Sequence, residues 1–305
     1  MGRVRIAYDE MSMFQDNADE FAIPYDGPPT VRRASVEVEP GRHLSALVWG
    51  DADPELVFLH GGAQNAHTWD TVALALARPL VAIDLPGHGH SDGGRNGSLD
   101  VRANAEDIAT AVRTLAPNSK AVVGMSLGGM TTLALADVAP DVVRKLVLVD
   151  VTPGVDGQKA SAIVAFINGP ESFPNFDEIL ARTIEFNPSR TESSLRRGIL
   201  HNAVQQEDGS WVWRYQRFRA AEPGETARVE HPEFGTLWDS VSNLTVPLML
   251  VRGMTAQSVV DDADEAELLR RQPNARIEHV EDAGHSIQGD KPVELAELIT
   301  DFADS

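Results

Sequence analysis

The sequence predicts an α/β protein in which helices cover both faces of a mostly parallel sheet and a helical cap is inserted between two of its strands. Three observations predict this fold. Short apolar runs alternate with helix-like segments, as in parallel sheets that are buried on both faces. A block of about 90 residues then interrupts the alternation and is too long for an ordinary loop. Finally, a Gly-x-Ser-x-Gly turn joins an apolar strand to an apolar helix.

The elements before residue 155 supply most of the predicted sheet. Two short strands flank Pro40-Gly41-Arg42, which predicts a hairpin. Continuous apolar runs predict buried strands, and helix-like segments separate several of them. The strands are expected at 33–39, 44–49, 56–59, 80–83, near 122 and at 145–149, with helices at 99–115 and from 127 to about 137.

The later elements divide into a cap and the remainder of the sheet. Helix-like pieces at 160–167, 176–186 and 195–204 and an aromatic cluster at 211–215 belong to the block. Strands at 247–251 and 275–280 and helices at 264–271 and 293–302 resume the sheet. The predicted domains are an N-terminal extension (1–30), a core (31–154 and 245–305) and a helical cap (155–244). The extension shows no regular period and is expected to be mobile or to lie across the surface.

Composition argues against several classes of function. The chain has 305 residues, 42% of them hydrophobic, and no cysteine, so disulfides and cysteine-ligated metals are not expected. A formal net charge of −20 opposes binding to nucleic acid and to anionic membranes. No apolar run approaches the roughly 20 residues that span a bilayer. We expect a cytoplasmic protein with a small-molecule substrate and no metal; its oligomeric state, a homodimer included, is left open.

The turn at Gly124-Met125-Ser126-Leu127-Gly128 is the most informative local motif. A strand that reverses into a helix within a few residues crowds the backbone, and glycine fits there because it lacks Cβ. Ser126 at the apex is then held in a strained conformation, with its hydroxyl clear of the sheet edge. A serine hydroxyl is scarcely nucleophilic near neutral pH, so a base and an acid are needed from elsewhere in the chain.

Further motifs stand where the predicted strands end, and active sites of open parallel sheets lie at that edge. With these motifs the chain resembles the α/β-hydrolase fold family, of the type with a helical cap. The resemblance covers about residues 31–303 and implies an eight-stranded-type sheet, a serine nucleophile and no cofactor. The motifs occur in the family's order and are His60-Gly61-Gly62-Ala63 with Trp69, Asp84-Leu85-Pro86-Gly87-His88-Gly89-His90-Ser91, Gly124-Met125-Ser126-Leu127-Gly128-Gly129, Val149-Asp150-Val151-Thr152-Pro153 and Ala283-Gly284-His285.

The resemblance carries catalytic roles onto individual residues. Ser126 matches the nucleophile, and His285, which follows the last predicted strand, matches the base that activates it. The backbone N–H groups of Gly62 and Leu127 match the two donors of an oxyanion hole. His60 is expected to support the loop of that hole rather than to react.

The acid of the triad has two candidate positions. Asp150 lies directly at the end of the sixth strand, a known alternative placement in the family, and is the preferred candidate. Asp261, Asp262 and Asp264 are the alternative group, although they stand where a helix begins and acids complement the helix dipole. The chosen residue must accept a hydrogen bond from His285 and stabilise its charged form.

The substrate pocket is expected beneath the cap, as a covered and mainly apolar cavity. Met125 beside the nucleophile and the cap aromatics Trp211, Trp213 and Tyr215, together with Phe218, are the candidates to line it. Alternatively, the aromatic side chains form the hydrophobic core of the cap itself.

The expected activity is that of a serine hydrolase that cleaves a small-to-medium, largely apolar carboxylic ester through an acyl-enzyme on Ser126. Two alternatives use the same triad. One is hydrolysis of a carbon–carbon bond, in which Arg214, Arg217 and Arg219 would grip an acidic substrate, and the other is a cofactor-free haloperoxidase-like reaction. A ligand sensor with slow turnover is the alternative from outside the enzymes.

Overall fold

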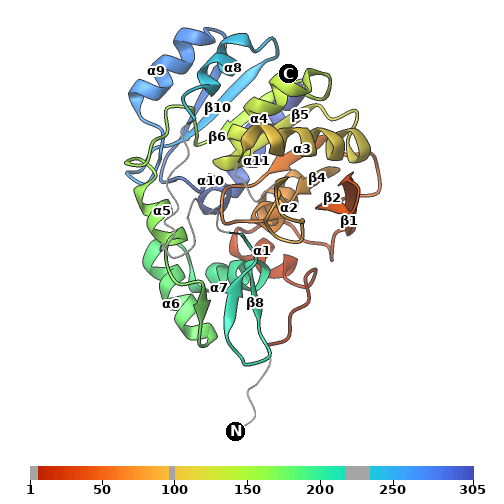
Figure 1. Cartoon of the computed structure of the whole chain (residues 1–305), viewed down its shortest axis with the longest axis vertical. Coiled ribbons are helices and arrows are strands. Elements are labelled where there is room, and N and C mark those ends of the chain that lie inside the picture. The colour runs from red at the N-terminus through yellow and green to blue at the C-terminus, as the bar shows by residue number, and fades with distance from the viewer. Residues whose placement is uncertain (1–5, 96–99, 217–233) are drawn as a thin grey trace.

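The computed structural model describes residues 6–95, 100–216 and 234–305, and a sheet of eight strands forms the centre of the core (Figure 1). The strand order is β1-β2-β4-β3-β5-β6-β10-β11. The β1–β2 and β2–β4 pairs are antiparallel and the other neighbours are parallel. The strands are β1 Val31–Glu39, β2 Arg42–Trp49, β3 Leu56–Leu59, β4 Leu80–Ile83, β5 Ala121–Met125, β6 Leu146–Val149, β10 Leu248–Gly253 and β11 Arg276–Val280.

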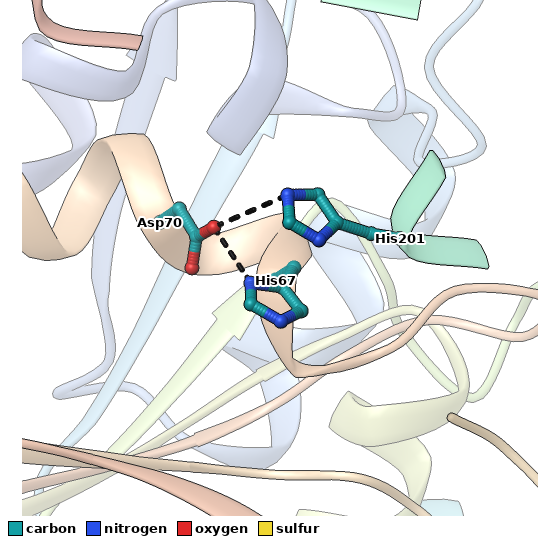
Figure 2. Close-up of side chains that lie close together, drawn as sticks. All are labelled: His67, Asp70 and His201. Atoms are coloured by element: carbon teal, nitrogen blue, oxygen red, sulfur yellow. Dashed lines mark hydrogen bonds and ion pairs between the residues drawn. The ribbon is translucent and has the colours of Figure 1, made fainter. Parts of the chain in front are cut away.

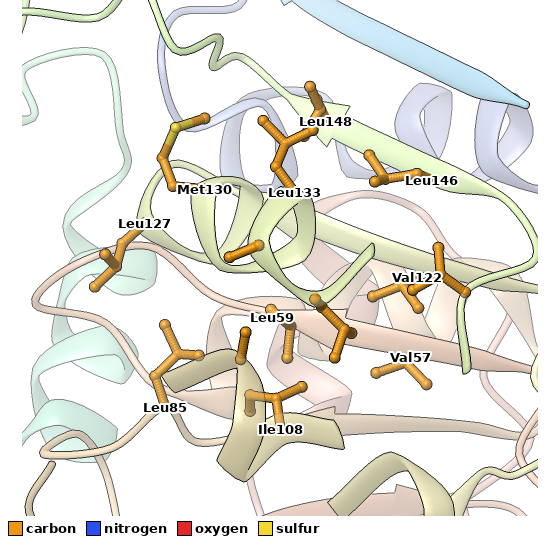
Figure 3. Packing of buried hydrophobic residues seen from close by; sticks show 14 of the residues in the cluster. Val57, Leu59, Leu85, Ile108, Val122, Leu127, Met130, Leu133, Leu146 and Leu148 are labelled. Carbon is orange, nitrogen blue, oxygen red and sulfur yellow. The ribbon is translucent and has the colours of Figure 1, made fainter. Parts of the chain in front are cut away.

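Helices cover both faces of this sheet because successive strand residues point to opposite sides. Val57 and Leu59 of β3 join one buried cluster, whereas Leu56 and Phe58 of the same strand join another. In Figure 3, α4 passes between side chains of the first cluster, with Leu148 of β6 on one side of the helix. The first cluster includes residues of α3 Val101–Leu115, α4 Leu127–Val138, α8 Leu237–Asn243 and α9 Asp262–Arg271. The second includes residues of α1 Phe14–Glu20, α2 Asp70–Leu76, α10 Ile287–Asp290 and α11 Pro292–Asp304.

The cap combines helices with a small antiparallel sheet of its own, in the order β7-β9-β8. Its apolar residues form a separate buried cluster, which includes Ile179, Ile199 and Trp211. One helix within the predicted cap range, α8, packs instead on α4 of the core, through Leu237 and Val241. The cap elements are α5 Ser161–Ile167, β7 Ser172–Phe173, α6 Phe176–Phe186, α7 Glu192–Asn202, β8 Ala203–Gln205 and β9 Trp211–Trp213.

The N-terminal segment forms a helix and joins the core to the cap. The sequence did not predict this helix, because the segment shows no regular period. Phe14 of α1 is buried against Trp49, with ring centroids 4.9 Å apart. On its other side, α1 meets α7, where Arg197 donates to Asn17 at 2.8 Å and pairs with Glu20. Figure 1 places α1 between the core and α7. These tertiary contacts stabilise a helix of only seven residues, which is too short to persist on its own.

Within the part of the chain that the structure describes, no helix is both long enough and apolar enough to cross a membrane.

Candidate active site

Ser126 occupies a tight turn between β5 and α4 with a left-handed backbone conformation, φ 53° and ψ −121°. The flanking residues, Gly124 and Gly128, must be glycine because neither position has room for a Cβ. A Cβ at Gly124 would collide with Thr132 Oγ1, and a Cβ at Gly128 would collide with the carbonyl oxygen of Leu59 on the neighbouring strand. The turn therefore raises Ser126 at the carboxyl edge of the sheet, at a cost in backbone strain that the packing around it sustains.

His285 and Asp150 lie together at this edge. His285 Nδ1 is 3.0 Å from Asp150 Oδ2, and Asp150 is fully buried at the end of β6. The Asp150 carboxylate also accepts from Gly253 N–H at 2.9 Å, Ser258 Oγ–H at 2.6 Å and Val259 N–H at 3.1 Å. These donors fix the carboxylate in place. A proton on His285 Nδ1 donates to Asp150, and Nε2 is then the nitrogen able to accept a proton.

The rival carboxylates have other partners. Asp261 and Asp264 form a capping box at the start of α9, and both pair with Lys159, at 2.9 and 2.7 Å. Asp262 has a side chain 97% exposed and pairs with Arg252 at 2.8 Å. The structure thus pairs His285 with Asp150 and with none of the three residues in the alternative group.

The predicted oxyanion donors lie beside the serine. A Cβ at Gly62 would be 4.0 Å from Leu127 Cδ2, so the two residues are neighbours. Among the described residues, neither the Gly62 N–H nor the Leu127 N–H has an acceptor. Both donors are therefore available to a charge that develops near Ser126.

Two buried histidines and one cap residue hold the oxyanion loop. His60 Nε2 accepts from Leu85 N–H at 2.9 Å, and His88 Nε2 accepts from Ala63 N–H at 3.2 Å. Asn202, at the end of α7, donates to the Ala63 carbonyl at 2.6 Å. Burial lowers the pKa of His60 and lowers that of His88 to about 3, so both rings are neutral acceptors at ordinary pH. His60 Nδ1 also lies 2.8 Å from the Gly61 carbonyl oxygen, so the ring links the oxyanion loop to the segment after β4, which suits a supporting residue.

Ser126 and His285 line one cavity of about 660 Å³ between the core and the cap. Met125 and Trp213 line it, as expected, but Trp211 and Tyr215 are not among its lining residues, so that part of the pocket prediction is wrong. Trp211 packs on Phe176 inside the cap, with centroids 5.1 Å apart, and Tyr215 stacks behind Trp213. Trp211 and Tyr215 therefore pack against other aromatic residues, the alternative to lining the pocket that the sequence left open. Phe218, Arg217 and Arg219 lie outside the described residues.

Arg190 is a cavity residue that the sequence did not single out. It lies between α6 and α7, and its Nη2 donates to Ser194 Oγ at 2.5 Å. Lys159 and Arg197 also line the cavity, and each has a carboxylate partner, whereas no carboxylate lies within ion-pair distance of Arg190 among the described residues. Burial lowers the pKa of Arg190. Nothing in the local sequence distinguishes it from the other arginines of the cap.

A second group of titratable side chains lies in the wall of the same cavity. His67, Asp70 and His201 are buried side by side, and histidine and carboxylate are residue types that bind metals (Figure 2). His67 and Asp70 come from the start of α2 and the turn before it, and His201 comes from α7 of the cap. More than 130 residues separate His201 from the other two, so local spacing carried no signal of this cluster.

Comparison with known proteins identifies the family. A sequence profile described as the alpha/beta hydrolase family matches residues 56–298. Esterase Rv0045c of Mycobacterium tuberculosis is 43% identical over 97% of this chain and 96% of its own length. A solved structure of that esterase, from work on its inhibition by transition metals, has a TM-score of 0.84 at 41% identity and covers 98% of this chain and 100% of its own.

A more distant relative is the 2-(acetamidomethylene)succinate hydrolase of Mesorhizobium japonicum, which is 28% identical over 83% of this chain and 88% of its own length. The mostly parallel sheet of eight strands, with helices on both of its faces, is the architecture that the sequence predicted. The chain belongs to the alpha/beta hydrolase family and is an enzyme that hydrolyses esters.

Proposed function

We propose that the enzyme cleaves small-to-medium carboxylic esters through an acyl-enzyme on Ser126, with His285 as the base and Asp150 as the acid. The observation that carries this proposal is the 3.0 Å contact between His285 and Asp150 at the cavity that Ser126 also lines. Acyl transfer needs a nucleophilic serine, an oriented imidazole and two N–H donors, and these parts lie together at one edge of the sheet.

In the proposed reaction, Ser126 Oγ attacks the ester carbonyl while His285 Nε2 takes its proton. The Asp150 carboxylate stabilises the imidazolium, and the N–H groups of Gly62 and Leu127 donate to the oxyanion. When the tetrahedral intermediate collapses, His285 returns the proton to the departing alcohol and the acyl group stays on Ser126. His285 then takes a proton from water, whose oxygen attacks the acyl group and releases the acid. No cofactor takes part in these steps.

Apolar side chains of the cap support an ester with an apolar acyl or alcohol part. Phe166, Phe186 and Trp213 line the cavity, and the Phe166 ring lies 5.6 Å from that of Trp213. A cavity of about 660 Å³ is within the range that takes up small ligands. We therefore place the apolar part of the substrate against the cap and its carbonyl at Ser126.

A panel of p-nitrophenyl esters with increasing acyl length tests this function. We expect steady turnover with short and medium acyl chains, and a fall in kcat/KM once the chain exceeds the cavity. Release of one equivalent of p-nitrophenol followed by no turnover would instead favour a slow ligand sensor, and no release at all would contradict the proposal.

Arg190 favours a second candidate, namely an ester that also carries a carboxylate. A guanidinium that lines an active-site cavity, with no carboxylate of the described residues within ion-pair distance, is suited to bind a carboxylate of the substrate. The hydrolase from Mesorhizobium japonicum is named for a succinate derivative, a compound that carries carboxylates. Arg214, which the sequence offered for this task, is not among the residues that line the cavity.

Arg190→Gln is expected to lower kcat/KM for p-nitrophenyl hydrogen glutarate by about 10–100-fold, the effect of losing a hydrogen bond between charged groups. Activity on the neutral p-nitrophenyl pentanoate should change little. Arg196→Gln is the matched control, because Arg196 lies on α7, pairs with Glu192 and does not line the cavity. An equal loss on both esters, or no preference for the anionic ester in the unmodified enzyme, would contradict this candidate.

A further inference from the structure

The cluster of His67, Asp70 and His201 has the composition and spacing of a metal site. His67 Nδ1 is 2.8 Å from Asp70 Oδ2, and His201 Nε2 is 3.8 Å from the same oxygen. All three ligand atoms lie within 4.8 Å of one another, and the residues are 8%, 1% and 5% exposed. Figure 2 shows both ring nitrogens directed toward the Asp70 carboxylate.

Two polar atoms of this cluster make no hydrogen bond with the described residues. Asp70 Oδ1 and His201 Nε2 are buried, and neither has a hydrogen-bond partner among the described residues. Buried polar atoms are normally satisfied, because an unpaired one forfeits its hydration without a replacement. A cation placed between these side chains would satisfy His201 Nε2, the orphaned atom that lies with His67 Nδ1 and Asp70 Oδ2.

In His67 and His201, the ring nitrogen that faces away from Asp70 already has a hydrogen-bond partner. His67 Nε2 lies 2.9 Å from Glu10 Oε1, and His201 Nδ1 lies 2.9 Å from Tyr8 Oη. Histidines that bind metals nearly always donate their second N–H to such a partner, which fixes the tautomer and leaves the other nitrogen for the ion. Arg33 is also close, but it is occupied by Glu10 and Asp84.

We propose that His67 Nδ1, Asp70 and His201 Nε2 bind one divalent transition metal ion of the zinc class. Two imidazoles and one carboxylate form a donor set that suits zinc, and bonds of about 2.0–2.1 Å in a tetrahedron place ligand atoms about 3.3 Å apart. The separations of Asp70 Oδ2 from His67 Nδ1 and from His201 Nε2, 2.8 and 3.8 Å, lie on either side of that value. The cluster lines the cavity, which gives the ion a path of entry and leaves room for a water as fourth ligand.

An ion at this position would join three parts of the chain. His67 and Asp70 belong to the core, His201 belongs to α7 of the cap, and the outer partners Tyr8 and Glu10 belong to the N-terminal segment. None of these residues has a part in the proposed acyl transfer. The ion would therefore act by holding the cap and the N-terminal segment on the core, and its binding should raise the thermal stability of the whole chain.

The test is a calorimetric titration of the metal-free full-length protein with Zn²⁺ at mildly alkaline pH, repeated with Co²⁺. Both imidazoles must be deprotonated at the nitrogen that binds the ion, so an alkaline buffer reduces competition from protons. We expect one equivalent to bind, the Tm to rise, and the visible bands of four-coordinate Co²⁺ to appear. With no cysteine in the chain, thiolates cannot produce these signals.

His201→Gln and Asp70→Asn should each abolish the tight equivalent and the Co²⁺ bands. Glu10→Gln should weaken binding by about 10–100-fold, as is typical of outer partners. His279→Gln is the matched control, because His279 is exposed and bonded to a carboxylate, Glu265, at 2.8 Å, but lies outside the cluster.

Three results would overturn the proposal. The first is no binding of Zn²⁺ by the unmodified protein. The second is an unchanged affinity for Zn²⁺ in His201→Gln. This variant removes one proposed ligand of the ion and leaves Asp70 in place. The third is loss of binding in His285→Gln with retention in His201→Gln, since that would place the ion on the triad histidine.

Discussion

Ser126→Ala is expected to abolish ester hydrolysis, with a fall in kcat on the order of 10⁶-fold, the effect of removing a triad serine in other enzymes. The reason is that no other hydroxyl occupies the strained turn between β5 and α4. The same change should eliminate covalent labelling by an organophosphonate probe. The fold should be retained, because alanine keeps the Cβ and removes only the hydroxyl of a residue at the wall of the cavity.

A serine elsewhere in the cavity provides the control. Ser161 lines the same cavity at the start of α5 but is not held in a strained turn. Ser161→Ala should therefore still be labelled by the probe. Intact-protein mass spectrometry distinguishes the two variants directly, and unchanged labelling of Ser126→Ala would refute the assignment of the nucleophile.

Asp150→Asn is expected to lower kcat by about 10⁴-fold, as for a triad carboxylate elsewhere. Asparagine can still accept from Gly253 N–H and Ser258 Oγ–H through its carbonyl oxygen. Its amide nitrogen would then face His285 and the Val259 N–H, where the carboxylate had accepted two hydrogen bonds. This reverses the preferred tautomer of His285 and leaves the Val259 N–H unpaired. A modest fall in Tm should accompany the loss of activity.

Asp262→Asn separates the two candidate acids. Asp262 is exposed and pairs with Arg252 near the start of α9, so its replacement should leave kcat within about twofold, since exposed ion pairs contribute little. Steady-state kinetics on one p-nitrophenyl ester, with a thermal melt of each variant, is the measurement. A large loss in Asp262→Asn with none in Asp150→Asn would mean that the acid was wrongly chosen.

Elements with a strong local pattern were predicted closely. The runs at 56–59 and 80–83 coincide with β3 and β4, and the helix expected at 176–186 coincides with α6. A run of four apolar residues that ends at a turn is too short for a typical helix and therefore predicts a buried strand. The strained conformation at Ser126 also follows from local sequence, because the two glycines it requires stand within two positions of it.

Elements that depend on distant contacts were not predicted. α1 forms because Phe14 packs on Trp49 and Arg197 binds Asn17 and Glu20, contacts that join segments far apart in the chain. α8 lies within the range predicted for the cap but packs on the core through Leu237 and Val241. The sequence of a short amphipathic helix predicts an apolar face, but it does not predict which domain packs against that face.

By itself, the sequence determined the class of fold, the family and the turn that presents Ser126, because each rests on patterns a few residues long. The tertiary structure decided which carboxylate meets His285 and which aromatics reach the cavity. It also revealed Arg190 in the wall of the cavity and the cluster of His67, Asp70 and His201. The physical reason is that hydrogen bonds and burial act over a few ångströms in space, whereas these groups are brought together only when strand order and cap docking are complete.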